Sequence, residues 1–304
     1  MAQWIDQLES LKDNMKKVGI VSCDKWAGKI TEDLLLREEL LSCNIDADII
    51  SWEDKTIDYE KYDALVLRSV WGYHNKYQEF KDWLGFLKER NIPIYNPSDL
   101  ILNNIQKEKQ FKLLQNNNMP IIDTSFAHSE ENAKSVLENG NISVVKPIVS
   151  GSGERTFLLD GMTYQEKMEI IKSYMDLYEQ NDNGIMMQPF VSGVKSGEYA
   201  CVFIDGVNTH NIIRYPGIFA DKKKPVFIKN VPGEVMDLAN QVASIKEYKD
   251  CLYMRVDIVL DGEKPVLMEV ELAEPDLYFK RIDDEEVKKE GLSRLSRGIV
   301  RRIR

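Results

Sequence analysis

The sequence predicts a mixed fold, with an α/β unit of parallel strands at the N-terminal end and an antiparallel hairpin near the C-terminus. Over roughly the first hundred residues, short apolar runs alternate with helical segments, which is the pattern of a doubly wound parallel sheet. Near the C-terminus, two runs of alternating apolar residues flank the turn Asp261–Lys264. That pattern predicts an antiparallel β-hairpin.

In the first unit, apolar runs are expected to form strands at Lys17–Ser22, Ile45–Ser51, Ala64–Arg68 and Ile92–Tyr95. Helices are expected between them at Thr31–Ser42 and Tyr77–Arg90. Ligands bind such sheets beyond the carboxyl ends of the strands.

The loop Arg68–His74 follows one of these strands and brings together a cation, a hydroxyl group and aromatic rings. A substrate-facing function is one interpretation of this loop. The other is that Trp71 and Tyr73 only pack the loop against the sheet. The residues alone leave both open.

A second unit is expected to begin near Asn96-Pro97 with a helix that contains Lys107 and Lys109 and ends at Asn116–Asn118. A strand at Ile142–Lys146 then runs directly into a loop of small residues. The lysine at the strand end supplies a point charge, and glycine lets backbone N–H groups approach phosphate oxygens. A plain hairpin turn is the alternative. The candidate phosphate-binding residues are Lys146, Ser150, Gly151, Ser152 and Gly153.

A proline interrupts the next predicted strand, Gly184–Val191, which follows a helix at Tyr164–Gln180. Because Pro189 cannot donate a ladder hydrogen bond, we expect an edge strand or a hinge. Backbone groups around Gln188 and Phe190 would then be free to bind a ligand, and an adenine ring would suit such a site.

Three candidate site residues lie in the segments Gly193–Gly206 and Thr209–Pro216. Glu198 is either a pocket residue or a solvated strand residue. His210 is either structural or in contact with substrate, and Arg214 adds a cation. A further helix is expected at Glu234–Tyr248.

The C-terminal hairpin has one apolar face and one charged face, because side chains alternate along a strand. A hairpin centred on Glu263 sets Asp257 opposite Glu269 and Arg255 opposite Glu271. Opposed Cβ atoms are roughly 4.5–5.5 Å apart, so like charges repel and something positive should lie between them. The residues expected on the core face are Met254, Val256, Ile258, Val266, Met268, Val270 and Leu272.

Three carboxylates beside an arginine suit a nucleotide-bound Mg²⁺, which takes oxygen ligands from one or two carboxylates and from phosphates. The predicted metal ligands are Asp257, Glu269 and Glu271. The alternative is the solvated face of an antiparallel sheet, with Arg255 and Glu271 as a surface ion pair.

The composition argues against several classes of function. The chain has 304 residues, of which 43% are hydrophobic, and a net charge of −10, which disfavours binding to nucleic acid or an anionic membrane. Small molecules are therefore the expected partners. The four cysteines and three histidines lack the spacing of a zinc site, a disulfide framework or a hydrolase triad. No apolar run approaches the ~18 residues of a membrane span and the N-terminus is polar, so we expect a cytoplasmic protein.

Four features together resemble the ATP-grasp fold: an early lysine in the second unit, the lysine-ended strand, the QPF segment and the acidic hairpin. The RSxW, VVKP, QPx and RVDxV…ELxEP segments are similar to the glutathione-synthetase-like branch, and within it to the group that includes the cycloserine-biosynthesis cyclo-ligase. The resemblance covers nearly the whole chain. It implies an N-terminal Rossmann-like domain at 1–98, and two α+β subdomains at 99–187 and 188–304 that clasp ATP, the last with the metal site.

The resemblance also implies functions for single residues. Lys109, chosen over Lys107 by its spacing to Phe111, and Lys146 would contact the phosphates, while Arg255 would steady the transferred phosphoryl group. Mg²⁺, or Mn²⁺, would be held by the three carboxylates, although Glu271 is commonly asparagine in relatives such as the D-alanine ligases. The implied catalytic residues are Arg255 and Lys146, and the implied cofactor-binding residues include Lys109, Gln188, Pro189, Phe190 and Glu198. The candidate substrate residues, by analogy and charge or by place, are Arg68, Ser69, Trp71, Tyr73, His210 and Arg214.

The implied activity is an ATP-dependent carboxylate–amine ligase, or an intramolecular cyclo-ligase. It would act on a small amino-acid-like or peptide substrate through an acylphosphate and release ADP and phosphate. The alternatives are a nucleotide-binding relative that does not ligate and an ATP-grasp enzyme that macrocyclises peptides. A homodimer is a further expectation from the resemblance.

Overall fold

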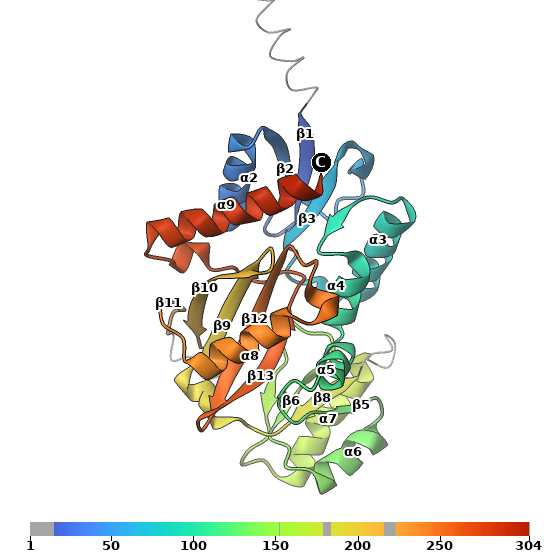
Figure 1. Cartoon of the computed structure of the whole chain (residues 1–304). Coiled ribbons are helices and arrows are strands. Elements are labelled where there is room, and N and C mark those ends of the chain that lie inside the picture. The colour runs from blue at the N-terminus through green and yellow to red at the C-terminus, as the bar shows by residue number, and fades with distance from the viewer. Residues whose placement is uncertain (1–14, 152, 179–183, 216–222, 304) are drawn as a thin grey trace, which may run out of the picture.

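The structure is a computed structural model that describes residues 15–151, 153–178, 184–215 and 223–303. Its described strands form three sheets, which follow one another along the chain (Figure 1). The predicted Ser152 lies outside the described residues.

The first sheet is parallel and has the strand order β2-β1-β3-β4. Helix α2 packs on one face and helix α3 on the other, so the predicted doubly wound arrangement is confirmed. The C-terminal helix α9 returns to this sheet and packs beside α2 (Figure 1). The elements are β1 (Lys16–Ser22), α2 (Thr31–Ser42), β2 (Ile45–Ser51), β3 (Ala64–Ser69), α3 (Tyr77–Glu89), β4 (Ile94–Tyr95) and α9 (Glu285–Arg302).

The second sheet is antiparallel, with the order β5-β8-β6-β7, and helices α6 and α7 pack against it. The prediction that the strand before Pro189 lies at an edge is wrong, because β8 pairs with β5 on one side and β6 on the other. The proline is tolerated because β8 ends one residue before it. The elements are β5 (Ser125–Ala127), α6 (Glu130–Asn139), β6 (Val144–Pro147), β7 (Phe157–Leu158), α7 (Tyr164–Tyr178) and β8 (Ile185–Gln188).

The third sheet is also antiparallel and has the order β11-β10-β9-β12-β13, with α8 packed on one face. The helix predicted to reach Tyr248 ends at Ala243, and a short 3₁₀ turn follows at Lys246–Tyr248. The elements are β9 (Glu198–Ile204), β10 (Val207–Arg214), β11 (Val226–Ile228), α8 (Gly233–Ala243), β12 (Tyr253–Asp261) and β13 (Lys264–Glu271).

The predicted pairing of the hairpin is confirmed, because Asp257 lies opposite Glu269 and Arg255 opposite Glu271. The register shifts between Asp257 and Ile258, which is the mark of a β-bulge. One extra residue at Met268 turns the following side chains to the opposite face.

The bulge corrects the predicted core face at two positions. Leu267 is fully buried in the core under α8, whereas Val266 and Met268 are only partly buried and pack in a separate cluster. The prediction for Val266 and Met268 is therefore wrong, since strict alternation does not survive an inserted residue.

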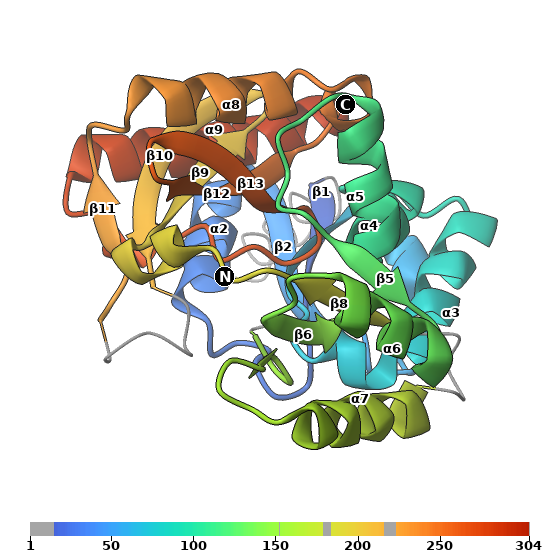
Figure 2. The same cartoon turned by 90° about the horizontal axis from the view of Figure 1, so that it is seen from below.

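Two helices lie between the first and second sheets where the sequence predicted one, α4 (Ser98–Ile105) and α5 (Lys107–Asn116). The α5 helix ends as predicted, with Asn118 in the left-handed region at a φ of 56°. Both helices lie beside β13 (Figure 2). No helix in the described ranges is long and apolar enough to cross a membrane. The boundaries at 98/99 and 187/188 stay a prediction.

Candidate active site

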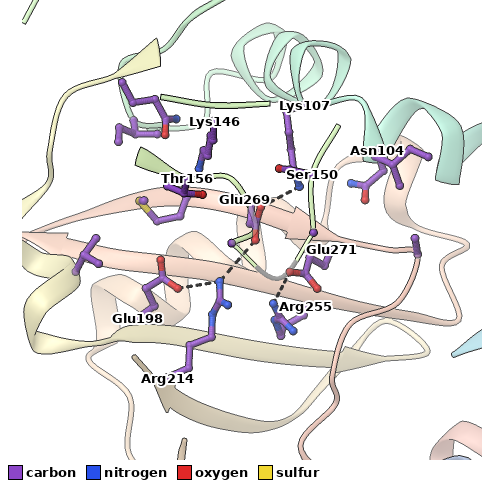
Figure 3. A pocket seen from close by; sticks show the side chains of 18 of the residues that line it. Asn104, Lys107, Lys146, Ser150, Thr156, Glu198, Arg214, Arg255, Glu269 and Glu271 are labelled. Atoms are coloured by element: carbon purple, nitrogen blue, oxygen red, sulfur yellow. Dashed lines mark hydrogen bonds and ion pairs between the residues drawn. The ribbon is translucent and has the colours of Figure 1, made fainter. Parts of the chain in front are cut away.

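A cavity of about 630 Å³ is lined by residues from the second and third sheets and from the loop after β3 (Figure 3). Strands β6 and β8 supply one wall, and the charged face of β9, β10, β12 and β13 supplies another. The loop after β3 closes one end of the cavity with Trp71 and Tyr73. The predicted phosphate, hinge and metal segments are therefore brought together.

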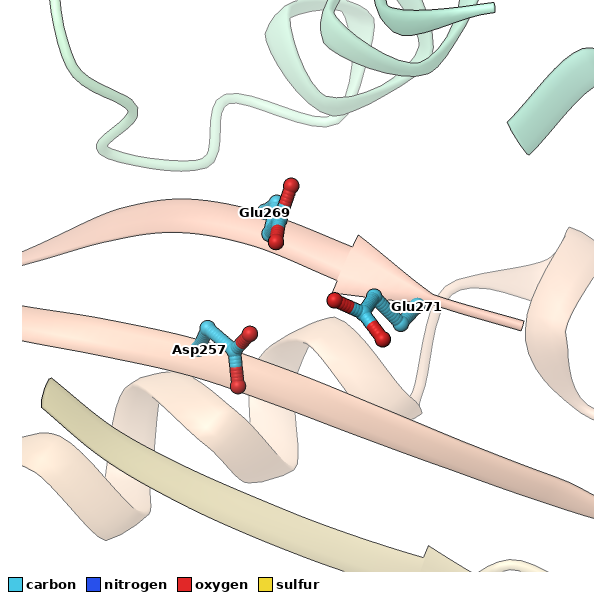
Figure 4. A group of neighbouring side chains, drawn as sticks. All are labelled: Asp257, Glu269 and Glu271. Atoms are coloured by element: carbon cyan, nitrogen blue, oxygen red, sulfur yellow. The ribbon is translucent and has the colours of Figure 1, made fainter. Parts of the chain in front are cut away.

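The three predicted metal ligands form a compact group, with one oxygen from each of Asp257, Glu269 and Glu271 within 4.8 Å of the others (Figure 4). Glu269 and Glu271 line the cavity, and their side chains are 21% and 24% exposed. Asp257 is fully buried beneath them. The cavity-facing pair is therefore the accessible part of the group.

Arg255 supplies positive charge between these carboxylates. Its Nε and Nη2 atoms each donate to Asp257 at 2.9 Å, and Nη2 also donates to Glu271 at 2.5 Å. Arg214 adds a second guanidinium, 2.7 Å from Asp257, and it also pairs with Glu198 at 2.8 Å. Asp257 thus accepts three hydrogen bonds from two arginines and retains one of its about four lone-pair directions.

Lys107 completes the group from the other side, with Nζ 2.9 Å from Glu269 Oε2 (Figure 3). Its position follows from two amide side chains that satisfy the free edge of β13. Asn104 bonds the carbonyl of Val270 and the N–H of Leu272 at 2.9 and 3.1 Å. Gln110 bonds both backbone groups of Val270 at 2.8 and 3.0 Å. These bonds fix α4 and α5 against the strand that carries Glu269.

The prediction that Lys109 contacts the nucleotide is contradicted by its place on α5. Lys107, Gln110, Phe111 and Leu114 form the buried face of this helix, and Lys109 is exposed. Two residues correspond to about 200° of helix rotation, so Lys107 and Lys109 point in nearly opposite directions. Of these two lysines, Lys107 is the one that lines the cavity.

Lys146 is the penultimate residue of β6, one residue before the strand end, and lines the cavity opposite the acidic face (Figure 3). Within the described ranges, its ammonium group has no hydrogen-bond or ion-pair partner. Burial lowers the pKa of Lys146, and the nearby charge of Glu269 opposes that effect. An unpaired, desolvated cation is the partner that an anionic ligand such as a phosphate would satisfy.

The glycine-bearing loop follows Lys146, and Ser150, Gly151 and Gly153 line the cavity. A Cβ atom on Gly151 would lie 3.0 Å from His74 Nδ1, which is tighter than ordinary packing. Gly153 has a φ of +69°, which favours glycine. The contact at Gly151 and the backbone conformation at Gly153 therefore both favour glycine.

The predicted hinge residues Gln188, Pro189 and Phe190 also line the cavity. The expectation of a free backbone at Gln188 is wrong, because its carbonyl accepts a hydrogen bond from the N–H of Ser143 at 2.9 Å. The reason is the interior place of β8, which leaves its last carbonyl within the ladder.

Burial and neighbouring charges set the protonation of the acidic pair. Burial raises the pKa of Glu269, but Lys107, Arg214 and Lys146 outweigh it and hold the pKa below its usual range. Burial, together with the carboxylates of Glu269 and Asp257, raises the pKa of Glu271 to about 8 against the effect of Arg255. Burial also raises the pKa of Glu198. The pKa values of Glu269 and Glu271 are therefore shifted in opposite directions, so Glu269 is the more readily ionised of the two.

Three of the predicted substrate residues do not line the cavity. Arg68 is buried and donates from Nη2 to the carbonyl of Pro275 at 2.9 Å, and Ser69 donates to Asp33. His210 is buried, with Nε2 2.5 Å from the carbonyl of Leu277. Each of these side chains makes a hydrogen bond within the fold. Trp71, Tyr73 and Arg214 do line the cavity.

Sequence reasoning missed several cavity residues. Lys107 could have been found by helical periodicity, since it shares the apolar face of α5 with Phe111. Glu274 lies in the ELxEP segment, but no other charged residue at a characteristic spacing marked it as a site residue. The missed polar residues are Asn104, Lys107, Thr156, Glu274, Asp276 and Tyr278.

Comparisons with known proteins found similar sequences. A family model described as the N-terminal domain of D-cycloserine synthetase DcsG matches residues 18–96. The cycloserine biosynthesis protein DcsG of Streptomyces lavendulae is 23% identical over 292 residues, covering 88% of this chain and 93% of that protein.

Two solved structures share the fold. The crystal structure of D-cycloserine synthetase DcsG gives a TM-score of 0.78 at 20% identity, covering 95% of this chain and 100% of that chain. The D-alanine–D-alanine ligase from Bacillus anthracis, complexed with ATP, gives 0.64 at 20% identity, covering 95% and 97%. The fold is that of the ATP-grasp ligases.

The family model, the sequence relative and one solved structure carry the same name, DcsG, so the chain is similar to the cycloserine-biosynthesis group.

Proposed function

We propose that the protein is an ATP-dependent ligase that joins a carboxylate to an amine, or cyclises one molecule, on a small amino-acid-like or peptide substrate. The observation that carries this proposal is the single cavity in which Lys146 faces the acidic group of Asp257, Glu269 and Glu271. The similar proteins are named synthetases and ligases, which supports the same reaction class.

The residues fit Mg²⁺ and ATP. Glu269 and Glu271 offer oxygens to a divalent cation, and Mn²⁺ prefers the same ligands. Lys107 and Lys146 would hold phosphate oxygens, and Gln188–Phe190 would border the base. Bound Mg²⁺ would neutralise phosphate charge during phosphoryl transfer, for which positioning and charge neutralisation are the main requirements.

Arg255 has the position to hold charge on the transferred group. It is 3% exposed and fixed by Asp257, Glu271 and the carbonyl of Asp276, so its geometry is set before any ligand binds. The proposed chemistry is attack of the substrate carboxylate on the γ-phosphate, which gives an acylphosphate and ADP. An amine then displaces phosphate.

Cytoplasmic location and the absence of nucleic-acid and membrane partners remain our proposals, supported by the net charge of −10. A homodimer is a proposal that rests on the resemblance alone.

The test is nucleotide product analysis with Mg²⁺–ATP and pooled amino acids and dipeptides, for the wild type and Glu269→Gln. We expect substrate-stimulated release of ADP and phosphate in the wild type and its loss in the variant. Release of AMP and pyrophosphate would indicate adenylation and overturn the acylphosphate route. ATP binding without turnover by any pool would favour the relative that does not ligate.

A further inference from the structure

Three of the four cations that line the cavity are already paired with acids. Lys107 contacts Glu269. Arg214 contacts Glu198 and Asp257, and Arg255 contacts Asp257 and Glu271. Among the described residues that line the cavity, the charged groups without an ion-pair partner are one cation, Lys146, and one anion, Glu274.

Glu274 lines the cavity and is only partly exposed. Among the described residues, no other residue donates a hydrogen bond to its carboxylate and no cation forms an ion pair with it. A partly buried carboxylate without a partner costs free energy, which a cationic ligand would recover.

The backbone that presents Glu274 is held by side chains at four consecutive carbonyls. Tyr253 donates to the carbonyl of Ala273 at 3.2 Å, and Trp71 donates to that of Glu274 at 3.2 Å. The next two carbonyls, of Pro275 and Asp276, accept from Arg68 at 2.9 Å and Arg255 at 3.3 Å. The carboxylate therefore extends from a fixed backbone, and its place does not depend on loop motion.

The surroundings of Glu274 suit a cation. The indole N–H of Trp71 donates to the backbone carbonyl of Glu274, and Trp71 also lines the cavity. A Cβ atom on Gly151 would lie 3.8 Å from Glu274 Oε1, so the glycine-bearing loop borders the same space. A carboxylate beside an aromatic ring binds an ammonium group by a charge-assisted hydrogen bond and a cation–π contact.

We propose that Glu274, with Trp71 beside it, binds a primary ammonium group of the substrate. This inference rests on the proposed function and deepens it, because it makes the substrate an amino acid or peptide with a free amine. Lys146 and Glu274 then divide the cavity into a part for the anionic nucleotide and a part for the cationic end of the substrate.

The experiment compares wild type, Glu274→Gln and Glu263→Gln. Glu263 lies exposed at the turn of the same hairpin, so its variant controls for loss of one negative charge. The probes are D- and L-alanine and D- and L-serine, their N-acetyl derivatives, and Mg²⁺ with the non-hydrolysable analogue AMPPNP. The readouts are binding affinity for each amino acid on the nucleotide complex, and AMPPNP affinity.

We expect at least one free amino acid to bind the wild type and the Glu263→Gln variant about 10- to 100-fold more tightly than its N-acetyl derivative. Glu274→Gln should lose that preference and keep its AMPPNP affinity. If no amino acid is preferred over its N-acetyl derivative, or if the preference survives in Glu274→Gln, the ammonium site is overturned while nucleotide binding stands. Failure of the wild type to bind AMPPNP would instead refute both proposals.

Discussion

Lys107 Nζ lies 2.9 Å from Glu269 Oε2, which joins the first residue of α5 to the acidic face of β13. The amides of Asn104 and Gln110 bond the edge of the same strand and hold the helix there. One lysine of the pair at 107 and 109 is thereby selected by helix geometry, and it is the one that the resemblance did not favour.

Replacing Lys107 by methionine should lower kcat/KM for ATP about 100-fold, because one cation beside the phosphates and Glu269 is lost. Lys109→Met is the matched control, since Lys109 is exposed on the opposite face of α5. The measurement is kcat/KM for ATP in both variants by steady-state kinetics. Equal effects of the two substitutions would contradict the assignment of Lys107.

Lys146→Met should weaken ATP binding without destabilising the ligand-free protein. The Lys146 ammonium is desolvated and has no partner in the described ranges, so its removal should change the free energy of unfolding of the ligand-free protein by less than about 1 kcal/mol, or raise it. Affinity for ATP should fall about tenfold or more. Denaturant unfolding without ligand, and nucleotide titration, measure the two quantities. A large loss of stability with unchanged ATP affinity would show that Lys146 is structural.

The β-bulge at Met268 predicts opposite consequences for two neighbouring residues. Leu267→Ala should lower the free energy of unfolding by about 2–5 kcal/mol, because Leu267 is fully buried under α8. Met268→Ala should cost about 1 kcal/mol and alter AMPPNP affinity, since Met268 lines the cavity. Chemical denaturation and nucleotide binding test the pair. If Met268→Ala destabilised the protein more than Leu267→Ala, the assignment of the bulge to Met268 would be contradicted.

The buried His210 should make stability depend on pH. Burial lowers the pKa of His210 to about 4, against the hydrogen bond to the carbonyl of Leu277, whereas an unfolded histidine titrates near 6.5. The unfolded state therefore binds more protons between these values, so stability falls as the pH drops from 6.5 to 4, by up to about 3 kcal/mol from this group.

The measurement for His210 is the free energy of unfolding against pH for the wild type and His210→Asn. The difference between the two curves removes the contribution of other titrating groups. The difference in unfolding free energy between the two proteins should become smaller as the pH falls from 6.5 to 4, because only the wild type loses the contribution of the neutral histidine. Parallel curves of unfolding free energy against pH would contradict a lowered pKa for His210 in the folded protein.

The sequence was sufficient where local patterns decide the structure. The strand and helix alternation placed β1, α2, β2 and β3 to within a residue, and the turn at Asp261–Lys264 set Asp257 opposite Glu269. These features depend on neighbours in sequence, so periodicity reports them directly.

Features that depend on contacts between residues far apart in the sequence were not predicted. The interior place of β8 requires β5, which no local pattern near Pro189 reveals. Arg68 looked like a substrate anchor, but in the fold it meets the carbonyl of Pro275, 207 residues away. Glu274 became visible only when the partners of the surrounding cations were known. Each of these features depends on which strands and side chains pair and which are buried, and the sequence alone does not show this.

The most direct test of the account is the Mg²⁺ dependence of AMPPNP affinity in the wild type, Glu269→Gln and Asp261→Asn, the last being an exposed control on the same hairpin. We predict that Mg²⁺ tightens AMPPNP binding about tenfold or more in the wild type and in Asp261→Asn. In Glu269→Gln this gain should fall to less than about twofold, because the metal loses a ligand. The same Mg²⁺ dependence in all three proteins would contradict a metal site on this acidic face.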